Sequence, residues 1–179
     1  MEAPDETLAL AAAGGDRAAF AALVTRHYDR VFGLAWRLTG SAADAQDLAQ
    51  DICAALPGKL AGWRGEARFT TWLYRVVVNA AADLRRRHMT RARAADGWGD
   101  WEIARQAEAA EAQAARDWLE GAMAKLSPEL RETVALVLGE DLTQAEAAQV
   151  LGLSEGTIAW RMSEVKKRLR RMAETEEAP

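Results

Sequence analysis

The stretch LTQAEAAQVLGLSEGTIAWR, residues 142–161, decides the fold of the C-terminal half of this chain. Thr143 is followed three residues later by Glu146, which is the spacing of a capping box at the start of a helix. Gly152 can adopt the left-handed conformation that ends this helix, and Ser154 can cap the next one. The stretch therefore predicts a helix-turn-helix, two short helices joined by a tight turn.

The second helix of this motif has one apolar face and one polar face. Its apolar residues recur three and four positions apart and form a single stripe, made of Ile158, Met162, Val165 and Leu169. The opposite face is polar, with basic residues on both sides, and consists of Thr157, Trp160, Ser163, Glu164 and Lys167. Because such a helix can pack its back on a domain and lay its front in a DNA major groove, the pattern predicts duplex binding.

Length and composition favour a cytoplasmic, all-helical protein. The chain has 179 residues, many of them alanine, and only four prolines. It contains no apolar run long enough to cross a membrane, and its acidic N-terminus lacks the pattern of a signal peptide. A single cysteine, Cys53, excludes an internal disulfide. We therefore expect a cytoplasmic chain with no membrane insertion.

The net charge of -4 conflicts at first with DNA binding, since phosphate neutralisation normally requires a basic protein. The positive charge is local, in one arginine cluster within residues 85–93 and a second cluster of arginines and lysines within residues 161–171. Two interpretations stay open at this point. A larger partner supplies most of the DNA affinity, or acidic surface away from the DNA is simply tolerated.

The N-terminal half also has helical periodicity. Apolar residues recur through residues 7–39, with a break at residues 14–16, and Ser41 can cap a further helix over residues 41–60. That helix has an acidic face that includes Asp47 and Asp51. Residues 62–68, GWRGEAR, are expected to form a loop, because two glycines surround a tryptophan and an arginine.

A strong helix is predicted from Phe69 to Arg87. Its expected buried face consists of Phe69, Trp72, Leu73, Val76, Ala80 and Leu84. Thr71, Arg75, Ala82, Arg85 and Arg86 are expected to face away, with Asn79 at the border.

The fold class that follows is all-α, with two small helical domains joined by a flexible, partly helical linker. Residues 88–100 look irregular and contain Trp98, and Trp101 follows directly. The next segment is rich in Ala, Glu and Gln. The predicted boundaries are residues 1–90 for the first domain, 91–117 for the linker, 118–173 for the second domain and 174–179 for an acidic tail.

Four motifs in a fixed order carry a family resemblance. They are DAQDLAQD at residues 44–51, FTTWLYRVVVN at 69–79, LSPELRE at 126–132, and the helix-turn-helix. Together they resemble the extracytoplasmic-function (ECF) sigma factors, the smallest type of bacterial RNA polymerase sigma subunit in the sigma-70 family. The resemblance covers residues 16–171 and identifies the two domains with sigma regions two and four.

The resemblance implies that the chain binds core RNA polymerase. The acidic helix is expected to dock on the clamp helices of the largest polymerase subunit through Asp47, Gln50 and Asp51, and region four is expected to rest on the flap. An anti-sigma factor is implied as an inhibiting partner. The chain is then not an enzyme and needs no cofactor, metal or small-molecule substrate. The isolated His27 and His88 also have no metal-ligand spacing.

The resemblance also implies contact with promoter DNA at two elements. The loop and helix around the minus-ten element hold a base flipped out of the non-template strand, a role open to a glycine-rich loop with aromatic and polar side chains nearby. The positions that match, together with basic residues suited to phosphates, are Trp63, Arg64, Arg68, Arg75, Asn79, Arg85 and Arg86. The expected contacts to the minus-thirty-five element are Ser154, Thr157, Trp160, Arg161, Ser163 and Lys167.

Some positions depart from the family pattern or allow two roles. Ala159 stands where a basic residue is common, Trp160 where a small residue is common, and Glu164 adds an acid to the groove-facing side. Trp160 can touch a thymine methyl or pack on a protein. Trp63 can wall the base pocket or anchor the loop, and Asn79 can contact a base or have no special duty.

Two other functions are compatible with the sequence. A stand-alone helix-turn-helix regulator would bind operators as a dimer without polymerase. A sigma mimic would bind a regulatory protein and no DNA, which the acidic balance and Ala159 leave open.

Overall fold

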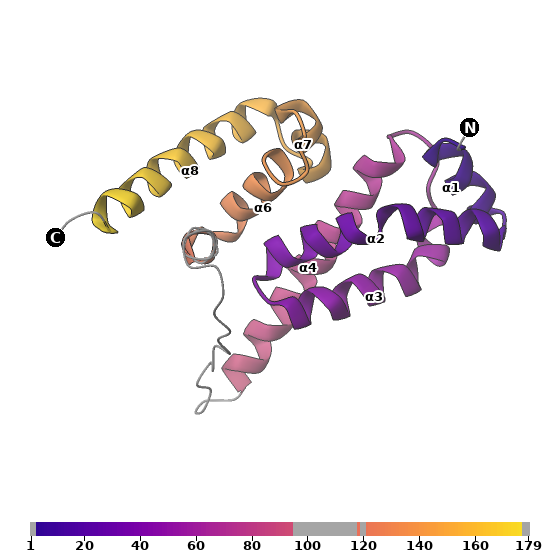
Figure 1. Cartoon of the computed structure of the whole chain (residues 1–179), viewed down its shortest axis with the longest axis horizontal. Coiled ribbons are helices and arrows are strands. Elements are labelled where there is room, and N and C mark those ends of the chain that lie inside the picture. The colour runs from indigo at the N-terminus through magenta and orange to yellow at the C-terminus, as the bar shows by residue number, and fades with distance from the viewer. Residues whose placement is uncertain (1–2, 95–117, 119–120, 177–179) are drawn as a thin grey trace, which may run out of the picture.

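The computed structural model describes residues 3–94, 118 and 121–176, and within these ranges the chain folds into helices with no strand (Figure 1). The N-terminal unit contains α1 (Asp5–Ala13), α2 (Arg17–Thr39), α3 (Ala42–Leu60) and α4 (Phe69–Ala94). The C-terminal unit contains α6 (Pro128–Val137), α7 (Gln144–Leu151) and α8 (Glu155–Glu176). The predicted all-α class with two helical domains is confirmed.

Short polar signals start and stop the helices of the N-terminal unit. The Asp16 carboxylate accepts a hydrogen bond from the Ala18 amide at 2.8 Å, so α2 begins after the predicted break. Gly40 ends α2 with a φ of 72°, and the Ser41 hydroxyl then accepts from the Asp44 amide at 3.2 Å. These caps satisfy amides that the first turn of a helix leaves without a partner.

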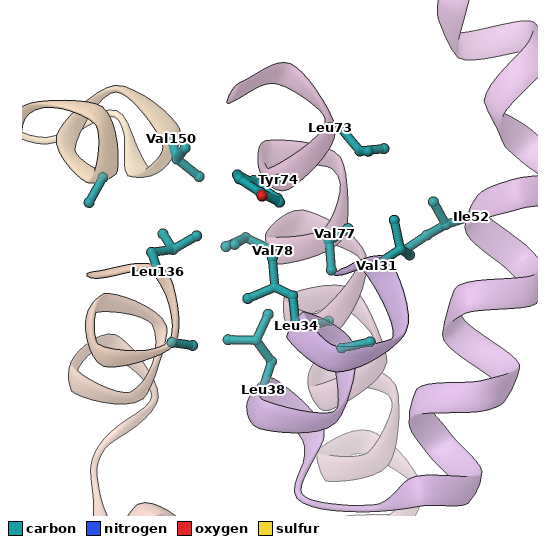
Figure 2. Packing of buried hydrophobic residues seen from close by; sticks show 14 of the residues in the cluster. Val31, Leu34, Leu38, Ile52, Leu73, Tyr74, Val77, Val78, Leu136 and Val150 are labelled. Atoms are coloured by element: carbon teal, nitrogen blue, oxygen red, sulfur yellow. The ribbon is translucent and has the colours of Figure 1, made fainter. Parts of the chain in front are cut away.

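The core of the N-terminal unit lies between α2, α3 and α4. Val31 of α2, Ile52 of α3 and Val77 of α4 are all buried and converge in this layer (Figure 2). Burying such side chains contributes roughly 1.5–3 kcal/mol each, which is the main source of stability for a bundle of this size. The core therefore holds the acidic face of α3 and the basic face of α4 at fixed positions on one unit.

Helix α4 departs from its predicted length and face. It continues to Ala94, past the expected end at Arg87, because residues 88–94 contain no glycine or proline. Thr71 was expected to face away but is 7% exposed. Tyr74 and Val78 are also buried, whereas four residues of the predicted stripe are half-buried: Trp72, Val76, Ala80 and Leu84.

The reason for the second buried face is a contact with the other unit. Tyr74 and Val78 of α4 face Leu136 and Val150 of the C-terminal unit (Figure 2). A periodicity analysis assigns one buried stripe to a helix, whereas α4 has a partner on two sides.

The predicted linker, residues 91–117, lies largely outside the described residues, and so do Trp98 and Trp101. Its first four residues belong to α4, and the first three residues of the predicted acidic tail belong to α8. No helix in the described part of the chain is both long and apolar enough to cross a membrane.

Candidate DNA-binding and partner-binding surfaces

The first helix of the helix-turn-helix begins at the predicted capping box. The Thr143 hydroxyl accepts from the Glu146 amide at 3.2 Å, and a Glu146 carboxylate oxygen accepts from the Thr143 amide at 3.0 Å. The bonds that the Glu146 carboxylate accepts from the Thr143 amide and the Thr143 hydroxyl lower the pKa of this carboxyl, with a further contribution from Arg68. Gly152 ends α7 with a φ of 66°. The predicted capping box and the predicted glycine stop are thus both present.

Helix α8 has the predicted buried back. Ile158, Met162 and Val165 are buried against the C-terminal unit, and Leu169 packs at the edge of the core. At its start, the Ser154 hydroxyl accepts from the Thr157 amide at 3.2 Å. The buried stripe fixes the rotation of α8, so its opposite face is presented to solvent.

Most of the predicted minus-thirty-five residues lie on that solvent-facing side. Ser154, Ser163 and Lys167 are exposed, and Trp160 is 64% exposed. Thr157 is half-buried and is hydrogen-bonded to Ser154.

Arg161 differs from the other predicted minus-thirty-five residues. It is half-buried, and its guanidinium donates to the carbonyl of Glu129 at 3.3 Å. That bond ties α8 to the first turn of α6, so Arg161 has a structural partner within its own unit.

The acidic residues of α3 form an exposed patch. Asp47, Gln50 and Asp51 all lie on the solvent side of the helix. On the opposite side, Leu48 and Ile52 are buried. The structure thus places the three predicted polymerase-binding residues together on one accessible face.

The loop before α4 is anchored by its tryptophan. Trp63 is 7% exposed and meets the Phe69 ring edge-on, with the ring centroids 6.1 Å apart. Its indole nitrogen is buried and has no hydrogen-bond partner among the described residues. Arg64 and Arg68 of the same loop are exposed. In this conformation Trp63 occupies the anchoring position of its two predicted roles.

The predicted minus-ten residues of α4 divide into two groups. Asn79 and Arg86 are exposed, and Arg86 pairs with Asp83 one turn earlier. Arg75 and Arg85 reach the C-terminal unit instead. The Arg75 guanidinium donates to the carbonyls of Gln149 and Val150 at the end of α7, the latter at 3.3 Å.

Two further ion pairs join predicted minus-ten arginines to the C-terminal unit. Arg85 lies 3.5 Å from the Glu132 carboxylate, and Arg68 lies 3.5 Å from the Glu146 carboxylate. Burial raises the pKa of the Glu132 carboxyl, while Arg85 acts in the opposite direction. The candidate DNA-binding surface of α4 is therefore partly covered by acidic groups of α6 and α7.

Sequence reasoning missed a second set of contacts between the units. Arg37 of α2 pairs with Glu140 at 2.7 Å, and the Glu140 side chain is 6% exposed. Burial, together with nearby Glu140, raises the pKa of Tyr74 to about 12. Arg131 donates to the carbonyls of Met123, at 2.9 Å, and of Ala124 and Leu126, and reaches that of Leu38 at 3.5 Å. Of these contacts, Arg37 with Glu140 and Arg131 with Leu38 join the two units, and no local sequence signal marks them because the partners lie 103 and 93 positions apart. The other carbonyls that Arg131 binds belong to its own unit.

The described residues contain no group of three or more His, Cys, Asp or Glu side chains placed to hold a metal ion. The surfaces that the structure presents are suited to macromolecules: an acidic patch on α3, a basic face on α4, and a polar, basic face on α8.

The sequence profile of Sigma-70 region 2 matches residues 23–91, and that of Sigma-70 region 4 matches residues 116–169. The ECF RNA polymerase sigma factor SigM of Mycobacterium tuberculosis is 32% identical over 174 residues, which cover 96% of this chain and 85% of SigM.

Two solved structures have the same fold. CnrH in complex with the cytosolic domain of CnrY has a TM-score of 0.73 and 27% identity, covering 97% of this chain and 99% of CnrH. RpoE in complex with the anti-sigma factor NepR, from Bartonella quintana, has a TM-score of 0.74 and 21% identity, covering 87% of this chain and 96% of RpoE. Sigma factors are transcription initiation factors and are not enzymes. On the two sequence profiles and the similarity to SigM, the chain belongs to the sigma-70 family as an ECF sigma factor.

Proposed function

We propose that this chain binds core RNA polymerase in the cytoplasm, directs it to promoters with two recognition elements, and assists strand separation. The observation that carries the proposal is the exposure of an acidic patch on α3 and a polar face on α8, each opposite a buried stripe. Polymerase supplies the covalent chemistry, and the sigma factor supplies contacts.

The acidic patch of α3 is proposed as the polymerase-binding site. Asp47, Gln50 and Asp51 can pair with basic side chains and donors on the clamp helices of the largest subunit. A partner that delivers the chain to DNA also explains how a protein of net charge -4 acts on a polyanion.

The polar face of α8 is proposed to read the minus-thirty-five element in the major groove. Trp160, Ser163 and Lys167 are all exposed along this face. Lys167 is suited to a phosphate, whereas Trp160 can contact a thymine methyl.

The loop at residues 63–68 and the exposed face of α4 are proposed to hold the melted minus-ten strand. Asn79 can hydrogen-bond an extruded base, and Arg64 and Arg86 can neutralise neighbouring phosphates. Holding unpaired bases on one strand makes strand separation more favourable without any covalent step.

An anti-sigma factor is proposed as a regulatory partner. A cleft of about 580 Å³ lies between α2 and α6, and its apolar lining includes Phe32, Trp36, Met123, Val134 and Leu138. Trp36 is 42% exposed and Leu138 is 62% exposed, which is unusual for such large apolar side chains. An apolar helix of an anti-sigma factor would cover them, and the RpoE relative was solved with an anti-sigma factor bound.

A charge in this cleft tests the proposal. Leu138→Asp is expected to weaken binding of the anti-sigma factor and so to raise transcription from the chain's own promoter in cells. The cellular concentration of the chain should be unchanged.

Run-off transcription with purified core polymerase tests the main proposal. The template is the DNA upstream of the chain's own coding sequence, and the expected result is a discrete transcript that requires both the chain and the core enzyme. Specific duplex binding by a dimer without polymerase would support a stand-alone regulator instead. Binding to a regulatory protein with no transcript would support a sigma mimic.

A further inference from the structure

Helix α4 begins directly after a residue that cannot cap it. The Trp72 amide donates to the carbonyl of Arg68 at 3.1 Å, so Arg68 occupies the position that precedes the first turn. An N-cap residue normally offers a side-chain oxygen to the free amides of that turn, whereas an arginine side chain has only donors. An acceptor for the first amides of α4 must therefore come from elsewhere in the chain.

Such an acceptor comes from α1. A Glu6 carboxylate oxygen accepts from the Phe69 amide at 3.3 Å, across 63 positions of sequence. The positive end of the α4 dipole also favours a negative charge at this place. Because Glu6 is exposed, water competes for the bond, and its contribution is expected to be modest. Glu6 thus acts as an N-cap that is supplied by another helix.

The neighbouring Asp5 holds α1 in the position from which Glu6 reaches α4. The Asp5 carboxylate accepts from the Arg26 guanidinium at 2.5 Å and lies 2.9 Å from Nε2 of His27. His27 is 4% exposed, and its ring centroid lies 5.3 Å from that of Phe69. The first turn of α1 therefore contacts the main chain of Phe69 directly and supports the Phe69 ring through His27.

Phe69 connects this support to the loop before α4. Its side chain is fully buried, and the Trp63 indole packs against it edge-on. The loop is thus fixed at its start by the contact of Trp63 with the Phe69 ring, and at its end by the peptide bond from Arg68 to Phe69. Between these ends Gly65 has a φ of 72°, a left-handed conformation that favours glycine. One buried residue therefore anchors both ends of the loop.

We propose that Glu6 is a positioning residue for the minus-ten loop, because it fixes the start of α4 and, through Phe69, the conformation of residues 63–68. The inference rests on the function proposed above for that loop. Helix α1 lies before residues 16–171, which the family resemblance covers, so the motifs give it no role. Glu6 need not touch DNA. Without it the first turn of α4 frays, and the loop is held less often in the conformation that receives an unpaired base.

Three variants test this role. Glu6→Ala removes the acceptor, whereas Glu6→Gln keeps an acceptor oxygen and removes only the charge. Asp16→Ala is the matched control. The Asp16 carboxylate accepts from the amides of Ala18 and Ala19, so this change removes a side-chain N-cap from α2 and is expected to cost at least as much stability.

The variants are compared at two steps with core polymerase, opening by permanganate footprinting and closed-complex formation by gel retardation. We expect Glu6→Ala to reduce opening about three- to tenfold, with closed-complex formation within about twofold of wild type. Glu6→Gln should recover most of this loss, and Asp16→Ala should open like wild type. An opening defect of equal size in Glu6→Gln or Asp16→Ala, or no defect in Glu6→Ala, would overturn the proposal.

Hydrogen exchange of the Phe69 amide, followed by NMR on the free chain, checks the cap itself. Exchange should be faster in Glu6→Ala than in wild type and should return toward wild type in Glu6→Gln. Equal exchange in all three chains would also overturn the proposal.

Run-off transcription with core polymerase separates this inference from the proposed function. If the wild type initiates transcription and Glu6→Ala opens promoters equally well, the positioning role is wrong and the sigma function stands. If the wild type supports no initiation, the proposed function itself fails, and the positioning role fails with it.

Discussion

Two tryptophans show how strongly the surroundings of a residue decide its role. Trp63 is 7% exposed and packs edge-on against Phe69, whereas Trp160 is 64% exposed on α8. The sequence alone allowed both to contact a ligand. Their burial indicates that one supports the fold and that the other is available to a partner.

Substituting the two tryptophans should therefore change the stability of the chain to very different extents. Trp63→Ala is expected to lower the free energy of unfolding by roughly 3–5 kcal/mol, because it leaves a cavity against Phe69. Trp160→Ala should change it by no more than about 0.5 kcal/mol. Urea denaturation followed by circular dichroism gives both values, and similar losses for the two variants would contradict the assigned burial.

Trp160→Ala should instead change recognition. If the indole contacts a thymine methyl, the variant loses preference among minus-thirty-five sequences in a run-off competition with substituted templates. If it packs on a protein, affinity for that protein falls while the sequence preference stays the same. A variant unchanged in both respects would remove Trp160 from the site.

At the scale of elements, α3 combines a buried face and an accessible acidic face in one helix. Alanine at Asp47, Gln50 and Asp51 should weaken binding to core polymerase by about tenfold or more, since charged contacts at an interface are lost together. Helicity should be unchanged, because all three residues are exposed and alanine favours helices.

Affinity for core polymerase can be measured by fluorescence with the triple alanine variant. The matched control replaces two other exposed acids, Asp29 and Glu174, which lie on α2 and α8. An equal loss of affinity in the control would mean that net charge alone explains the weaker binding. An unchanged affinity of the triple variant would exclude α3 as the docking site.

Helix α4 should act after the first encounter with the promoter. Asn79→Ala is expected to impair strand opening several-fold more than formation of the closed complex, since a flipped base exists only in the open complex. Permanganate footprinting reports opening, and gel retardation with polymerase reports closed-complex binding. Thr25→Ala, which also replaces an exposed, uncharged polar residue but lies on α2, is the matched control. Equal opening by Asn79→Ala and wild type would argue against the base pocket.

Local signals explain why the helix-turn-helix could be predicted so closely. The capping pairs of Thr143 with Glu146 and of Ser154 with Thr157 span three residues each, and their geometry is set by the backbone they cap. The position of α8's buried stripe follows from the same short-range periodicity. The C-terminal end of α4, by contrast, was predicted too early. Residues 88–94 contain no glycine or proline, and no capping residue marks the end of the helix in the sequence.

At the scale of the whole molecule, contacts over long sequence distances were beyond prediction. The sequence indicates that Arg75 lies on the outer side of α4, and within the N-terminal unit alone this is its position. Its partners in α7 lie more than seventy positions away, and the packing of two units decides that they meet. Arg85 and Arg68 likewise meet partners far along the chain, Glu132 and Glu146.

Titration of Tyr74 gives a direct measure of this packing. In a Tyr28→Phe background, Tyr74 is the remaining tyrosine, and its phenol absorbance should titrate with a midpoint of about 12. The pKa is raised in the folded chain, so the stabilising effect is full below the ordinary pKa of about 10 and is lost as the pH rises through about 12. Adding Arg37→Glu should lower the midpoint, because opening exposes the phenol and moves Glu140 away. An identical midpoint in both variants would indicate that the units stay packed.

The free face of α8 has a consequence for the order of events at a promoter. On the roles proposed above, the α8 side chains suited to duplex DNA are exposed in this arrangement, while Arg68 and Arg85, proposed for melted DNA, are paired with Glu146 and Glu132. On these roles, contact with the upstream duplex would precede contact with the separated strand.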